Sequence, residues 1–234
     1  MSGSEYPRPL APGTVLLPFE WLHRPESPEH ADAAVARVFD AIAEAGLGKP
    51  SIEQHHGKAE GLEILDCALN GDLILDGELQ LILHTAETTL WQPNRLQLRL
   101  PPPFAGPRAD CSKRILEQLG TRLDCDAALL STAHMGSFTP HPFLDAMGQP
   151  PPCWLILLGM REYGPAERYR NGPGTTTTLG DGHHILIEAA SPPWDHDSVD
   201  AACALREIGS WFRGLDAMSK TVVANLSALE REVE

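Results

Sequence analysis

The stretches CWLILLG (residues 153–159) and HHILIE (residues 183–188) are two short apolar runs in the second half of the chain. Proline-rich sequence precedes the first run and follows the second. Apolar runs of this length between such breakers are typical of buried strands. Apolar residues then recur at helical spacing over 199–212, and Asp195 or Asp197 can cap that helix. The sequence therefore predicts a strand, a long loop, a second strand and a helix.

In the first half, the segment 62–86 carries two hairpin signals, Asn70-Gly71 and Asp76-Gly77, each between apolar runs. Both dipeptides favour type I′ turns, because the two central residues of such a turn need positive φ. We therefore expect a meander of antiparallel strands here. The polar segment 49–61 before it is predicted to be a loop.

The remaining elements follow from the same periodicities. A first strand is predicted at residues 14–22, at an edge of the sheet, because Pro18 removes a ladder donor. A helix is predicted from Ser27 as N-cap to its stop at Gly46. Further elements are predicted as follows: a strand at 95–100, a helix at 110–119, a strand at 126–132 and a last helix at 218–229.

Clusters of strands separated by helical segments favour an α+β fold over a doubly wound one. We expect a mainly antiparallel sheet with helices packed on one face. Residues 1–234 are predicted to form a single domain, with residues 1–13 as a loose arm. Two similar halves within that domain are an arrangement that also fits the pattern.

The chain of 234 residues has 32 acidic and 18 basic side chains, a net charge of −14. This balance argues against direct nucleic-acid binding, which needs a basic surface, and permits a basic protein partner. The five cysteines are an odd number without a CxxC pair, which indicates reduced thiols. No signal peptide and no stretch of membrane-spanning length is recognisable, so we expect a cytoplasmic protein without a membrane partner.

The acidic residues are concentrated in one region. Residues 26–78 contain twelve acids and three bases, and no lysine or arginine occurs between Lys58 and Arg95. We interpret this region as a docking face for a cationic partner, with a merely solvated acidic surface as the alternative. The predicted contact residues, including two aromatic side chains of the kind that dominate interfaces, are Glu60, Glu63, Asp66, Asp72, Asp76, Glu78, Trp194 and Trp211.

An enzymatic function has weaker support. The ten histidines do not show the i, i+4 or CxxC-like spacing that aims metal ligands at one point. No GxSxG, HExxH or GxxxxGK[ST] motif occurs. We therefore predict no catalytic, cofactor-binding or metal-ligating residue. A small metal-dependent hydrolase that uses the histidine-rich loops at 134–141 and 181–196 stays open as an alternative.

Together, the Trp-containing run at 153–159, a variable loop, Gly180-Asp181-Gly182 before the strand at 183–188, a proline-rich turn and an Asp-capped helix resemble the C-terminal part of bacterial polymorphic-toxin immunity proteins. Over residues 126–213 the chain resembles the immunity protein 52 family in particular. The resemblance implies an α+β protein that is paired with a nuclease toxin of the restriction-endonuclease-like type. Such toxins are delivered by contact-dependent secretion, which includes type VI secretion.

The residues themselves support the same function. A nuclease must present a basic surface to phosphate, so an acidic protein that covers this surface competes with the substrate and associates rapidly. We therefore predict a non-enzymatic immunity protein that neutralises a cognate basic toxin. An acidic structural or assembly subunit is the other alternative, and the oligomeric state is left open.

Overall fold

The computed structural model describes residues 10–22, 31–55, 62–71, 74–84, 93–133, 153–195, 198–215 and 220. The strands are β1 (Val15–Leu22), β2 (Ser51–His55), β3 (Leu62–Gly71), β4 (Ile74–His84), β5 (Pro93–Leu100), β6 (Ala127–Thr132), β7 (Leu155–Gly159), β8 (Thr175–Thr178) and β9 (His184–Glu188). The helices are α1 (Ala31–Glu44), α2 (Ala109–Arg122), α3 (Met160–Tyr163) and α4 (Val199–Leu215), with 3-10 turns η1 (Pro102–Ala105) and η2 (Ala166–Tyr169).

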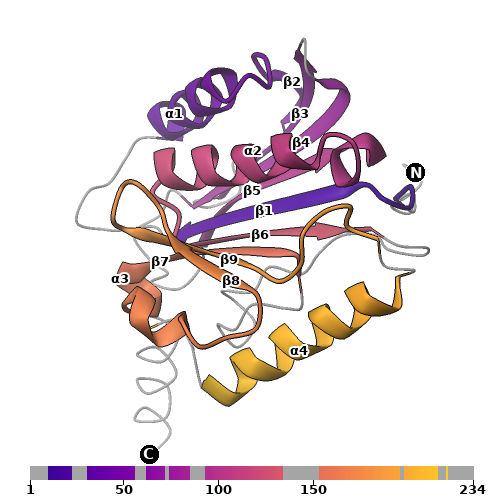
Figure 1. The fold of residues 1–234 in the computed structure, drawn as a ribbon. Helices are drawn as coiled ribbons and strands as arrows, with labels where there is room; N and C mark the ends of the chain where they lie inside the picture. Colours follow the sequence, from indigo (N-terminus) through magenta and orange to yellow (C-terminus); the bar gives the residue numbers. More distant parts are fainter. Residues whose placement is uncertain are drawn as a thin grey trace, which may run out of the picture.

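These strands form one nine-stranded sheet in the order β2-β3-β4-β5-β1-β6-β7-β9-β8 (Figure 1). Every neighbouring pair is antiparallel. The predicted α+β class with an antiparallel sheet is therefore confirmed. Within the described residues, no helix is both long and apolar enough to cross a membrane.

Strand β1 lies in the middle of the sheet, whereas the sequence placed it at an edge. It pairs with β5 along its whole length, from Val15 opposite Leu100 to Leu22 opposite Pro93. On the other side, β6 pairs with both ends of β1, and the ladder is interrupted at Leu17 and Pro18. Pro18 has no backbone N–H to donate, but it lies where the β1–β6 ladder is interrupted. An interior strand therefore tolerates this proline.

The segment 62–84 forms two long strands instead of the three short ones that were predicted. Asp76-Gly77 lies inside β4, where Gly77 pairs with Leu69, and Asn70-Gly71 ends β3 beside a register irregularity. The connection falls at residues 72–73, which lie outside the described residues. Continued pairing on both sides of Gly77 stabilises the strand more than a local turn preference opposes it.

Both edge strands replace predicted loops. Strand β2 lies within the predicted loop at 49–61, and all five of its side chains are exposed, so it has no apolar alternation to reveal it. Strand β8 lies in the long loop between the two apolar runs, together with α3 and η2. Its four threonines are β-branched residues that favour extended backbone.

The ends of the chain are described only in part. In the predicted loose arm 1–13, the structure describes residues 10–13, where the N–H of Gly13 donates to the carbonyl of Ala133 at 2.8 Å. Of the predicted helix at 218–229, it describes Lys220 alone.

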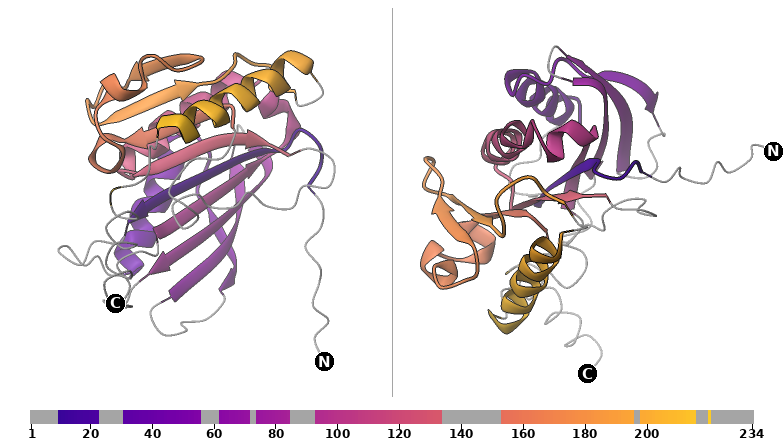
Figure 2. Two further views of the ribbon diagram at one scale, coloured as in Figure 1. Left: turned by 90° about the horizontal axis from the view of Figure 1, so that it is seen from below. Right: turned by 45° about the vertical axis from the view of Figure 1, so that its right-hand side comes forward.

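Two apolar layers lie on opposite faces of the sheet. Helices α1 and α2 cover one face, and α4 lies on the other face, below β6, β7 and β9 (Figures 1 and 2). The sequence placed the helices on a single face. Strands β6, β7 and β9 are buried at nearly every position, so both of their faces are covered.

The core makes a first prediction about stability. Leu157 in β7 is fully buried and packs directly against Gly120 of α2. The variant Leu157→Ala should lower the free energy of unfolding by about 2–5 kcal/mol, because it removes buried methyl groups and leaves a cavity. Val199→Ala is the control, since Val199 is 77% exposed and should change stability by less than about 0.5 kcal/mol. Equal urea midpoints for the two variants would contradict this packing.

The cysteines make a second prediction. All five are free, and Cys67, Cys125 and Cys153 are buried while Cys203 is exposed. Burial, reinforced by the charges of Asp66 and Glu53, raises the pKa of Cys67 to about 11. Burial also raises the pKa values of Cys125 and Cys153. Iodoacetamide at pH 8 should therefore modify Cys203 in the native protein and the three buried thiols only after unfolding, as read by mass spectrometry.

Candidate functional site

Four of the six acidic residues predicted to bind a partner lie on β3 and β4, near one end of the sheet. Leu65 and Cys67 on β3 face the core, so Asp66 between them points to the opposite face. Glu78 on β4 is exposed and shares that face. No described helix covers this face of β2–β5. The backbone places Glu63 in β3 and Asp76 in β4, while Glu60 and Asp72 lie outside the described residues.

Side chains on this face line a hollow of about 300 Å³. Gln80 donates to Asp66 at 2.8 Å, and Arg99 donates to Glu78 at 2.8 Å. We call this feature the acidic hollow, and its polar members are Glu53, Gln54, Asp66, Glu78, Gln80 and Arg99. Three carboxylates against one guanidinium give it a negative charge, which attracts cations.

The two tryptophans predicted as contacts lie elsewhere. Trp194 is buried, and its indole N–H donates to the carbonyl of Ala190 at 3.1 Å. Trp211 on α4 is half-buried, with its ring 6.2 Å from that of Tyr169 and 4.9 Å from that of Phe212. Trp194 therefore belongs to the core, whereas Trp211 serves the packing of α4, and the fold does not bring either of them to the acidic hollow.

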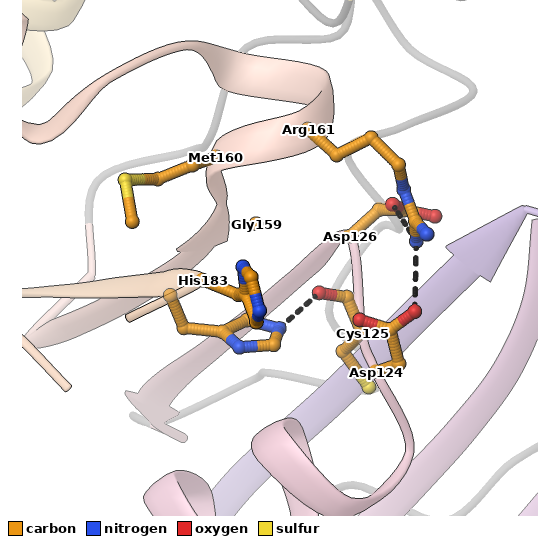
Figure 3. A pocket seen from close by; sticks show the side chains of 8 residues that line it. Asp124, Cys125, Asp126, Gly159, Met160, Arg161 and His183 are labelled. Carbon is orange, nitrogen blue, oxygen red and sulfur yellow. Dashed lines mark hydrogen bonds and ion pairs between the residues drawn. The ribbon is translucent and has the colours of Figure 1, made fainter. Parts of the chain in front are cut away.

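A second cavity, of about 340 Å³, lies where the connection between α2 and β6 meets the start of α3 (Figure 3). Arg161 lies between Asp124 at 3.1 Å and Asp126 at 3.0 Å. The Asp126 side chain is only 1% exposed, so Arg161 neutralises a buried carboxylate. Burial opposes the charge of Arg161, but the hydrogen bonds and charges of Asp126 and Asp124 raise its pKa.

His184 also lines this cavity. Its Nδ1 lies 2.5 Å from a carboxylate oxygen of Asp181, and its Nε2 lies 2.9 Å from the carbonyl oxygen of Cys125. Both ring nitrogens therefore have an oxygen partner within the fold. The pair holds the turn between β8 and β9 against the connection between α2 and β6. Neither ring nitrogen is left for a metal or a substrate.

The contacts of Asp181 set its ionisation. It accepts backbone N–H groups from His183 at 2.9 Å and from His184 at 3.1 Å. Burial alone would raise the pKa of Asp181, but these bonds and the His184 ring lower it below its ordinary value of 3.8. The carboxylate is therefore ionised throughout the neutral range, and it accepts from both backbone N–H groups and from the His184 ring.

The alternative of a hydrolase with histidine-rich loops rests partly on residues that the fold uses and partly on residues outside the described ranges, while His183 is exposed at the second cavity. His184 is committed to Asp181 and Cys125, while 134–141 and 196–197 lie outside the described residues. Within the described part of the chain, no group of three or more histidine, cysteine, aspartate or glutamate side chains is placed to hold a metal ion.

The fold is similar to that of the Pseudomonas aeruginosa T6SS protein PA0821, where T6SS denotes a type VI secretion system. The two share 11% identity over 83% of this chain and 76% of that chain, with a TM-score of 0.50. No family model matches the chain, and no curated protein matches it. At this identity the likeness is one of fold alone, and these comparisons assign the chain to no family.

Asp181 makes a third prediction. The variant Asp181→Asn should lower the free energy of unfolding at pH 7 by about 1–3 kcal/mol. It replaces the charged group that accepts from the His184 ring and from the backbone N–H groups of His183 and His184. A lowered folded pKa stabilises the protein above pH 3.8, and this stabilisation is lost as the pH falls through the folded value. The gap to the wild type should therefore be constant from pH 7 to pH 5 and narrow below pH 3.8.

Urea denaturation across this pH range measures the gap. Glu167→Gln is the control, because that carboxylate is 64% exposed and its ion pair with Arg170 is local, within one turn. A gap for Asp181→Asn that stays unchanged down to pH 3 would refute the ionised pair.

Proposed function

We propose that this protein is a cytoplasmic, non-enzymatic immunity protein that binds and neutralises a cognate toxin of nuclease type. The observation that carries the proposal is the acidic hollow, which lies on a sheet face that no described helix covers. An acidic face of this kind suits a partner with a basic surface. The fold likeness to a T6SS protein supports type VI secretion as the biological context.

Electrostatics explain how such a protein would inhibit. A nuclease needs lysine and arginine side chains around its active site in order to hold phosphate. A protein of net charge −14 is attracted to that surface, and the attraction raises the association rate. Binding then covers the basic surface and excludes the nucleic acid, so inhibition requires no chemistry by the immunity protein.

The proposal makes a fourth prediction, which concerns charge. Reversal of two carboxylates in the double variant Glu53→Lys/Glu78→Lys should slow association with the toxin at least tenfold and make it less dependent on salt. Both side chains are exposed, so the thermal melt should stay close to that of the wild type. The measurements are growth protection and surface-binding kinetics, with a candidate toxin taken from the genes that neighbour this one.

The matched control is Glu167→Lys/Glu207→Lys, which changes the net charge equally on exposed residues near the other end of the sheet. It should still protect cells. Equal protection by both double variants would move the interface away from the acidic hollow. A wild-type protein that gives no protection against this toxin would contradict the proposed function itself.

A further inference from the structure

Strand β2 is the outermost strand at the acidic end of the sheet. Within the described residues it pairs with β3 alone, and its five side chains are all exposed. Ile52 is 53% exposed, although it is a large apolar residue. An edge strand of this kind offers backbone N–H and C=O groups to a further strand.

The two edges of the sheet differ in chemistry. Strand β8 consists of four threonines in continuous register with β9. Strand β2 instead has a register irregularity between Ile52 and Gln54, and Glu53 lies at that irregularity. Irregularities and charges on an edge suppress indiscriminate strand pairing. A basic strand is attracted by the edge charge instead of being repelled by it. An edge of this kind therefore favours a basic partner strand.

The register shows which side chains an added strand would meet. Gln54 lies opposite Asp66, and Asp66 lies opposite Gln80, so a polar row runs inward from the edge on the open face. Ile52 lies opposite Cys67, which is buried, and therefore points to the other face. An added strand lies about 5 Å from β2 and about 10 Å from β3, within reach of a lysine or arginine side chain directed at Asp66.

We propose that β2 is the docking edge for an extended segment of the partner in which lysine or arginine alternates with apolar residues. The backbone of the segment pairs with β2, its basic side chains face Gln54 and Asp66, and its apolar side chains cover Ile52. Alternation follows from the opposite faces of successive residues in a strand. The identification of this partner as a toxin rests on the proposed function, whereas the docking mode does not.

A synthetic peptide tests the docking mode without the toxin. The probe is acetyl-Val-Lys-Val-Lys-Val-Lys-amide, added to the full-length protein, and the control peptide has glutamate in place of each lysine. Amide hydrogen exchange and NMR titration should show exchange slowed at least tenfold at residues 51–55, with a Kd that rises with salt. The glutamate peptide should leave these amides unchanged.

Two edge variants locate the contact. Ile52→Lys should raise the Kd for the lysine peptide at least tenfold, because it adds a like charge and removes the apolar contact. Thr177→Lys, on the exposed edge strand β8, makes the same charge change at the other edge and should leave the Kd unchanged. Asp66→Asn keeps the side-chain shape and should reduce the salt dependence of binding. Circular dichroism verifies that each variant is folded.

Several outcomes would overturn the docking mode: protection at β8 instead of β2, equal binding of the glutamate peptide, or an unchanged Kd for Ile52→Lys. Failure here is distinct from failure of the proposed function. If the wild-type protein protects cells while the lysine peptide leaves residues 51–55 unaffected, the immunity function stands and strand addition at β2 is refuted. If the peptide binds at β2 but the protein gives no protection, the docking edge stands and a toxin is refuted as its partner.

Discussion

The pairing of β1 on both sides is the constraint on which the rest of the sheet depends. Strands β5 and β6 do not pair with each other, and within the described sheet β1 lies between them and pairs with both. Within this seam, Arg95 lies 3.2 Å from the buried carboxylate of Glu20, whose own carbonyl accepts the N–H of Asp126 at 3.0 Å. Asp126 in turn holds Arg161. The acidic hollow on one side of β1 and the Arg161 cavity on the other are therefore positioned through the same strand.

The sequence predicted those elements whose apolar residues repeat with a clear period. Strands β7 and β9 and helix α4 were visible in this way because burial fixed both their length and their composition. The edge strands β2 and β8 were not, since exposed strands need no apolar alternation. Asp76-Gly77 gave a wrong prediction for a different reason: its turn preference is real, but continued pairing of β4 with β3 before and after Gly77 outweighs that preference.

Some features of the candidate site could likewise be predicted from the sequence, and others could not. The acidic region was visible because charge can be counted along the chain, and the fold gathers part of it on the open face of β3 and β4. The ion pair of Arg161 was invisible, because residues 124–126 and 161 meet only after β6 and β7 have paired. The histidines at 183 and 184 attracted attention as possible ligands, yet folding uses His184 to close the β8–β9 turn. Tryptophan at 194 resembled a hot spot, and burial makes it part of the core.

The central place of an N-terminal strand has a consequence for biosynthesis. Residues 15–22 are synthesised before either of their partner strands, and the second partner ends at residue 132, so about 110 further residues must be made first. At ordinary synthesis rates this takes roughly 6–22 s, and until then β1 can pair with β5 alone, so the edge that β6 will occupy stays unpaired. Antiparallel pairing between such distant segments is also slow to form. Under the proposed function, a cell would therefore need a standing supply of folded protein before its toxin arrives, because newly started chains protect nothing.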